Sequence, residues 1–157
     1  MTNDLFSRAG QILDVLREIE LVVAELYRRF SVFFPHDRVF WQDLSKDEEN
    51  HATMVTELKN TLLKNGAPFE VGAVDLFALA TCRKGIEGYL DRLQRGELGR
   101  RNAFFIARDF ERTVIELGFY NAVKSENKDY QLIQSKIQKE TEIHLQRLEN
   151  YIQTIFP

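Results

Sequence analysis

Cysteine, proline and glycine are scarce in this sequence. The 157 residues include one cysteine, three prolines and eight glycines. A lone Cys82 excludes an intrachain disulfide and the paired thiolates of a rubredoxin-type iron site. With so few residues that interrupt helices, the composition favours a few long helices over many short strands.

Excess basic charge and long apolar runs are also missing. A net charge of −3 provides no basic surface for nucleic acid and no polybasic anchor for anionic lipid. No apolar run approaches the roughly eighteen residues that read as a membrane-spanning helix. The first residues, MTNDLFSRAG, lack the basic and apolar pattern of a leader. We therefore expect a cytoplasmic protein that binds neither nucleic acid nor membrane.

The composition that is present is that of a folded globular protein. Apolar residues make up 44% of the chain and charged residues 29%, and there are 12 phenylalanines and 5 tyrosines. A disordered chain would have fewer large apolar side chains. This length and composition predict one domain, residues 1–157, with one sizeable core.

Apolar residues recur at three- and four-residue steps, which is the period of a helix. The spacing predicts long helices over about 4–34, 36–64, 100–125 and 129–156, with Pro35 ending the first. The spacing in residues 69–99 predicts one or two shorter helices. No stretch of useful length shows the alternation of apolar and polar residues that is typical of a strand. We expect an all-α fold of two helical hairpins, 4–64 and 100–156. A crossover over 65–99 joins them in one of the standard four-helix-bundle topologies.

Several ionisable residues lie within the apolar stripes of these helices. Positions three, four and seven residues apart share a helix face, and such neighbours are mostly apolar around five residues: Glu20, Glu48, His51, Glu111 and His144. A buried carboxylate must be paired, neutralised or bound to a metal. Mixed glutamate and histidine ligands suit iron or manganese. The alternative is that Glu48 and His51 form an exposed pair and that Glu20 is bonded to Tyr27 or His51.

The orientation of Glu111 has two readings. Ile106, Phe110, Thr113, Leu117 and Tyr120 form a competing apolar face, which would turn Glu111 outward. A π-bulge would shift the register and return it to the interior, and such bulges often lie at functional sites. If Glu111 points outward, Glu116 is the fallback ligand.

The two halves of the chain contain a short internal repeat. IELVVAELY, residues 19–27, aligns with FERTVIELG, residues 110–118, so that Glu20 matches Glu111. DEENH, residues 47–51, aligns with ETEIH, residues 140–144, so that His51 matches His144. Each predicted hairpin thus contributes one glutamate and one histidine, which indicates a duplicated half-site.

These residues resemble the rubrerythrin branch of the ferritin-like superfamily, whose four-helix bundle holds a non-haem di-iron site. Glu20, followed seven residues later by Tyr27, resembles the motif of the first helix. Glu48 and His51 resemble the first Glu-x-x-His motif. The resemblance implies that Glu20 and His51 are terminal ligands of one ion, that Glu48 is a bridge, and that Tyr27 supports a ligand.

The second half of the chain carries the rest of the resemblance. It implies that Glu111 and His144 hold the second ion, and that the centre reacts with O₂ or peroxide or oxidises Fe(II). It also implies a homodimer and a separate electron-donor protein. Aromatic residues near the Pro35 turn offer a dimer contact: Phe33, Phe34, Phe40 and Trp41.

The sequence departs from the family pattern at Thr141. The second Glu-x-x-His motif expects a glutamate three residues before His144, and threonine is a poor ligand for iron. Glu140, four residues before His144, is a fallback ligand, and Thr141 would lie beside the ligands. The open alternatives are a rearranged two-ion site, a single ion, or no metal. In the last case the chain is a non-enzymatic bundle that acts as a binding or assembly module.

Overall fold

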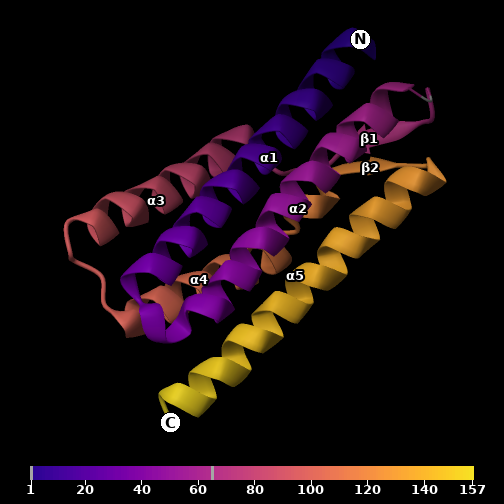
Figure 1. The fold of residues 1–157 in the computed structure, drawn as a ribbon. Helices are drawn as coiled ribbons and strands as arrows, with labels where there is room; N and C mark the ends of the chain where they lie inside the picture. The colour runs from indigo at the N-terminus through magenta and orange to yellow at the C-terminus, as the bar shows by residue number, and fades with distance from the viewer. Residues whose placement is uncertain (1, 65) are drawn as a thin grey trace.

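The computed structural model describes residues 2–64 and 66–157, which are mainly helical, as expected. Residues 1 and 65, the first residue and the expected start of the crossover, lie outside the described part. The described residues form five α-helices: α1 Thr2–Phe33, α2 Arg38–Lys64, α3 Leu76–Gln94, α4 Arg100–Glu116 and α5 Lys128–Ile155. Helix α1 packs against α2 and α3, and α5 packs against α2 and α4 (Figure 1). Four helices, α1, α2, α4 and α5, thereby contribute to one interior.

The turn between α1 and α2 forms at Pro35, as the sequence predicts. Proline has no N–H to continue a helix, and it fixes its own φ angle. Here Pro35 opens a short 3₁₀ helix, η1, Pro35–Asp37. Asp37 is buried at its end, and its carboxylate accepts hydrogen bonds from Arg100 at 2.6 and 2.8 Å and from Tyr151 at 3.0 Å. The turn is therefore tied to both α4 and α5.

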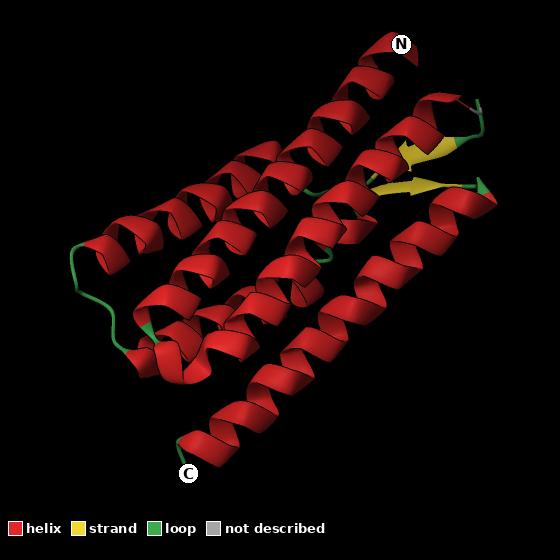
Figure 2. Cartoon of the chain, in the orientation of Figure 1, coloured by secondary structure: helices red, strands yellow, loops and turns green. Residues whose placement is uncertain are grey.

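Two short strands correct the expectation that the chain contains none. Strand β1, Phe69–Val71, pairs antiparallel with β2, Val123–Ser125. Figure 2 shows this pair at one end of the molecule, beside the start of α5. Each strand has three residues, which is too short to produce a recognisable alternation in the sequence. The crossover otherwise contains a single helix, α3, which begins at the N-cap Asp75.

Helix α4 is shorter than predicted, because it ends at Glu116 and not near residue 125. Gly118 has a φ angle of 61°, the left-handed conformation in which glycine commonly ends a helix. A second 3₁₀ helix, η2, Phe119–Asn121, and then β2 follow. The side-chain amide of Gln134 on α5 donates to the backbone oxygens of Tyr120 and Val123 and holds this segment in place.

The ending of α4 also resolves the two readings of Glu111. Helix α4 is a regular α-helix over its length, so the reading that required a π-bulge is wrong. Both Glu111 and Tyr120 are buried. Tyr120 reaches the interior because the chain turns at Gly118, and not because it lies on the same helix face as Phe110.

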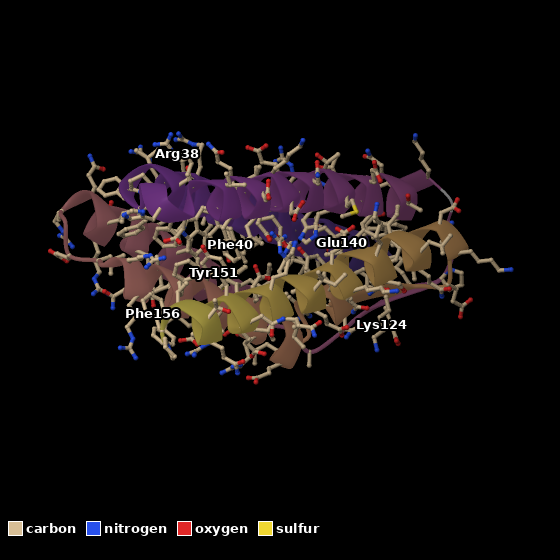
Figure 3. The ribbon with its side chains drawn as sticks, turned by 60° about the horizontal axis from the view of Figure 1, so that its bottom comes forward. Arg38, Phe40, Lys124, Glu140, Tyr151 and Phe156 are labelled. Carbon is tan, nitrogen blue, oxygen red and sulfur yellow. The ribbon has the colours of Figure 1, made fainter. Side chains whose placement is uncertain are left out.

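Aromatic side chains fill the interior next to the Pro35 turn. Phe40 on α2 stacks on Tyr151 of α5 with ring centroids 4.5 Å apart. Figure 3 labels both residues, which lie near each other between the two helices. Trp41 and Phe104 pack 4.6 Å apart, and Trp41 is fully buried. Trp41 therefore cannot contribute to the dimer contact expected at this turn. Within the described residues, no helix has both the length and the apolarity required to cross a membrane.

Candidate metal centre

Five ionisable side chains from four helices meet in the interior. Each is at most 3% exposed: Glu20 on α1, Glu48 and His51 on α2, Glu111 on α4 and His144 on α5. These are the five residues that helical spacing placed on apolar faces. The structure brings them together from positions up to 124 residues apart (144 − 20).

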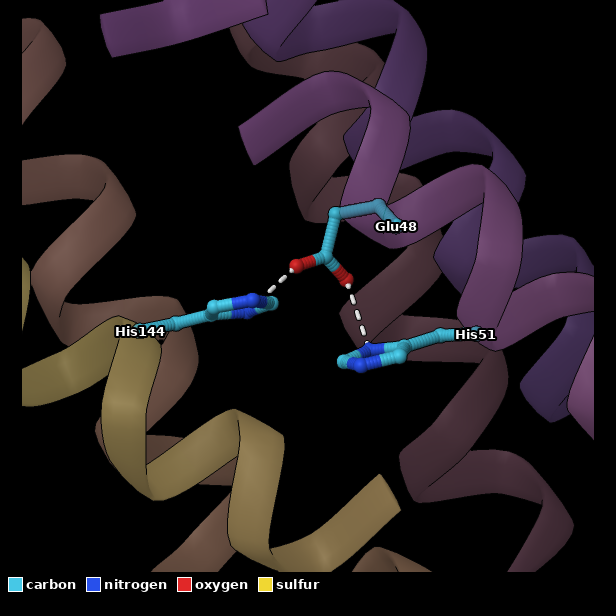
Figure 4. A group of neighbouring side chains, drawn as sticks. All are labelled: Glu48, His51 and His144. Atoms are coloured by element: carbon cyan, nitrogen blue, oxygen red, sulfur yellow. Dashed lines mark ion pairs between the residues drawn. The ribbon is translucent and has the colours of Figure 1, made fainter. Parts of the chain in front are cut away.

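Glu48 lies at the middle of the group. Figure 4 shows its two carboxylate oxygens directed at different histidines. Oε2 is 3.4 Å from Nδ1 of His51, and Oε1 is 2.9 Å from Nδ1 of His144. One ligand atom from each of these three residues lies within 4.8 Å of the others. The three side chains can thus hold one metal ion.

Two further carboxylates flank this trio, one beside each histidine. Glu20 Oε2 is 3.9 Å from Nδ1 of His51, and Glu111 Oε1 is 3.8 Å from Nδ1 of His144. The five residues therefore form two similar halves, Glu20 with His51 and Glu111 with His144. Glu48 contacts both halves.

The outer nitrogen of each histidine faces a carboxylate on the opposite helix. His51 Nε2 lies 2.9 Å from Glu140 Oε2, and His144 Nε2 lies 3.2 Å from Asp47 Oδ2. A carboxylate at this position accepts a hydrogen bond from the outer nitrogen and fixes the orientation of the imidazole. Both histidines therefore present Nδ1 to the interior of the centre.

Two tyrosines hold the flanking carboxylates. The hydroxyl of Tyr27 on α1 donates to Glu111 Oε1 at 3.0 Å, and the hydroxyl of Tyr120 donates to Glu20 Oε1. Tyr27 follows Glu20 in the sequence but donates to Glu111. Tyr120 follows Glu111 in the sequence but donates to Glu20. Burial and the neighbouring carboxylates raise the pKa of both phenols well above the ordinary value, so both stay protonated donors.

Thr141 interrupts the correspondence between the halves. Asp47 corresponds to Glu140 and His51 to His144, whereas the position that corresponds to Glu48 is Thr141. Thr141 is buried, and its hydroxyl donates to the backbone oxygen of Ile137 at 2.9 Å. It therefore supplies neither a second central carboxylate nor, within the described residues, a hydrogen bond to a ligand residue.

Burial and mutual repulsion set the charges of the centre. Desolvation, followed by the charge of Glu48, raises the pKa of Glu20 and of Glu111 well above the ordinary value. Burial opposes ionisation of Glu48 as well, but its contacts with Glu20, His144 and His51 outweigh burial and lower its pKa. Burial likewise disfavours the charged form of His144, yet Asp47 and Glu48 raise its pKa to about 10. The ionised form is thus favoured for Glu48 and His144, and the neutral form for Glu20 and Glu111.

Three buried polar atoms of the centre have no hydrogen-bond partner within the described residues: Glu20 Oε2, Glu48 Oε1 and His144 Nδ1. The last two are 2.9 Å apart but are not aligned as donor and acceptor. An orphaned buried polar atom costs about 1–3 kcal/mol, so three in one place require an explanation. A cation would accept all three as ligands, and the donor set fits that role.

The two fallback ligands do not lie among these inward donors. Glu116 is exposed at the end of α4, and Glu140 lies on the outer side of His51. Asp47 and Tyr120 are the two members of the centre that sequence reasoning did not assign. The repeat contained a signal for Asp47, which precedes His51 by four residues as Glu140 precedes His144.

Comparisons with protein-family models, with curated proteins and with solved structures found no significant match.

Proposed function

We propose that this chain is a metalloprotein that binds one transition-metal ion, iron or manganese, through Glu48, His51 and His144. Glu20 and Glu111 complete the ligand set with carboxylate oxygens. The observation that carries the proposal is that one ligand atom from each of Glu48, His51 and His144 lies within 4.8 Å of the others in the buried interior. Glu48 Oε1 and His144 Nδ1 have no hydrogen-bond partner among the described residues. Nitrogen and oxygen donors without thiolate favour iron or manganese among the redox-active metals.

Charge balance favours one ion over two. Without metal, ionised Glu48 is balanced by protonated His144, and the raised pKa values keep Glu20 and Glu111 neutral. One divalent ion can replace two protons, one from His144 and one from a flanking glutamate, and leave the interior neutral. A second ion would add charge on the side where Thr141 provides no carboxylate, and uncompensated charge is costly in a buried site.

The surrounding residues position the ligands and exclude water. Asp47 and Glu140 fix the rings of His144 and His51, and the hydroxyls of Tyr27 and Tyr120 hold the flanking carboxylates. Bound iron would supply redox chemistry toward O₂ or peroxide, which is the activity that the resemblance to rubrerythrin-like, ferritin-fold proteins implies. This part of the proposal rests on the resemblance, because fold and ligand set alone do not define a reaction.

A second candidate function follows from Thr141. If the missing carboxylate abolishes metal binding, the chain is a non-enzymatic helical scaffold with a buried polar network. The buried atoms without hydrogen-bond partners favour the metalloprotein, because a cation would bind all three, whereas a scaffold without a cation leaves Glu20 Oε2 unpaired.

Metal analysis distinguishes the two functions. The protein is expressed with iron, purified without chelator and analysed by mass spectrometry for metal. We expect about one iron per chain in wild type and in Glu49→Gln, an exposed neighbour. Glu48→Gln keeps the shape of the side chain but removes its charge, and should retain at most about a tenth of the iron. Metal-free wild type, or a Glu48→Gln variant with full metal content, would overturn the proposal.

A further inference from the structure

A cavity of about 230 Å³ lies beside the centre, between the end of α4 and helix α5. Two of its lining residues also belong to the surroundings of the centre. Tyr120 donates to Glu20, and Thr141 lies one helical turn before His144. The cavity therefore borders Tyr120 and Thr141, which lie next to the centre, on the side where the second carboxylate is missing. Its described lining includes none of the five candidate ligands.

Two features of the chain produce this space. Helix α4 ends at Glu116 and the chain turns at Gly118, so no further turn of α4 covers α5 opposite Thr141. Thr141 is also shorter than the glutamate at the corresponding position 48, and its hydroxyl points back to Ile137 of its own helix. A longer side chain at 141 would fill the inner end of the cavity.

The size of the cavity limits what it can hold. It far exceeds the roughly 10–15 Å³ that one water molecule needs. It is smaller than the roughly 300–1,000 Å³ of pockets that hold drug-sized ligands and cofactors. A molecule of a few heavy atoms fits, and an organic cofactor does not.

The residues that line the cavity favour an uncharged ligand. Val114 and Ile115 provide an apolar wall, and the side chains of Asn121 and Gln138 bond each other at 3.0 Å along another side. Glu142 is exposed at the rim and opposes the approach of anions.

We propose that this cavity is the ligand subsite of the metal centre, that it admits a small uncharged molecule, and that Thr141 keeps it open. The proposal rests on the proposed metal-binding function. The proposal also gives a reason for threonine at position 141. Thr141 stands where the repeat would place a second central glutamate, and its smaller side chain leaves the cavity open toward the centre.

The test uses nitric oxide, a small uncharged probe, and the iron(II)-loaded protein. The rate at which nitric oxide binds to the protein is followed by stopped-flow absorbance. The iron–nitric oxide complex that forms is identified by electron paramagnetic resonance. Ile115→Trp fills the cavity from its partly exposed rim, and Val114→Phe fills it from inside. Ile143→Trp makes the same change at an exposed site on α5 outside the cavity, and Thr141→Val keeps the size of threonine.

Both filling variants should slow nitric oxide binding at least about tenfold with unchanged iron content. Ile143→Trp and Thr141→Val should bind within about twofold of the wild-type rate. If Ile115→Trp folds, holds iron and binds nitric oxide at the wild-type rate, the subsite proposal is wrong while the metal site stands. Wild type that holds no iron would refute both.

The charge of the ligand class is tested with azide, a small anion, on the oxidised protein. Glu142→Gln should accelerate azide binding at least about twofold and leave nitric oxide binding unchanged, because it removes a negative charge from the rim. An unchanged azide rate would contradict the assignment to uncharged molecules.

Discussion

At the scale of single residues, the positions of the flanking carboxylates depend on two tyrosine hydroxyls. Tyr27 bonds Glu111 and Tyr120 bonds Glu20, so each hydroxyl compensates a carboxyl group buried from water. The other oxygen of Glu20 already lacks a partner. The loss of the hydrogen bond from Tyr120 would therefore leave both carboxyl oxygens of Glu20 without a partner.

Tyr120→Phe removes this hydroxyl and leaves the ring in place. We expect the metal-free protein to lose about 1–3 kcal/mol in free energy of unfolding, the cost of leaving a buried polar group unpaired. Urea titration of metal-free protein measures the loss. Tyr89→Phe is the control, because Tyr89 is partly exposed and its ring packs near Arg92. Equal stability of Tyr120→Phe and wild type would show that the bond to Glu20 contributes nothing.

The outer carboxylates, Asp47 and Glu140, contact the two histidines of the proposed metal site. Asp47 is partly exposed and its hydrogen bond with His144 lowers its pKa, so it is an ionised acceptor at neutral pH. Asp47→Asn should weaken iron binding about 10–100-fold, as is typical when the partner of a metal-bound histidine is removed. Competition with a chelator of known affinity measures this change. Asp43→Asn, on an exposed part of α2, should bind iron like wild type.

Residue spacing predicted the inward group and missed two of its hydrogen-bond partners, Asp47 and Tyr120, for a physical reason. Glu20, Glu48 and His51 have apolar neighbours on their own helices, and a helix face is a local property of the sequence. The bonds of Asp47 and Tyr120 run between helices that are distant in sequence. Such contacts depend on how the helices are placed against one another, which periodicity does not encode.

At the scale of elements, the end of α4 decides where Tyr120 and the cavity lie. The apolar spacing continues past residue 117, so the pattern predicted a helix to about 125. Gly118 outweighs that pattern because its left-handed conformation lets the chain leave the helix and pair as β2.

Gly118→Ala tests this role of the glycine. A Cβ there would meet only ordinary contacts, the nearest atom being 3.6 Å away, so the cost is backbone strain of about 1–2 kcal/mol. Gly85→Ala, within α3 and with no atom near its Cβ, should instead stabilise the protein by about 0.5–1 kcal/mol. Thermal unfolding of both variants gives the comparison. Stabilisation by Gly118→Ala would contradict the assignment.

At the scale of the whole molecule, contacts between distant segments close both ends around the centre. The strands β1 and β2 pair at one end, and Asp37, Arg100 and Tyr151 join the α1–α2 turn to α4 and α5 at the other. Burial would raise the pKa of Asp37, but the hydrogen bonds from Arg100 and Tyr151 and the Arg100 charge lower it below its ordinary 3.8.

This lowered pKa makes the contribution of Asp37 dependent on pH. Ionised Asp37 stabilises the fold above pH 3.8, and the contribution is lost as the pH falls through the lower pKa of the folded state. Asp37→Asn should therefore cost about 1–2 kcal/mol at neutral pH, reduced because Arg100 is partly exposed. The difference from wild type should shrink below pH 3.8. A difference that stays constant from neutral pH to below that value, measured by urea unfolding, would contradict this.

The position of a bound ion is the most direct test of the central claim. Crystals of the iron-loaded protein are measured on both sides of the iron absorption edge. The account predicts one anomalous peak among Glu48, His51 and His144, with Glu20 and Glu111 turned toward it. Iron-soaked crystals with no peak between these three side chains, or with a peak elsewhere, would contradict it.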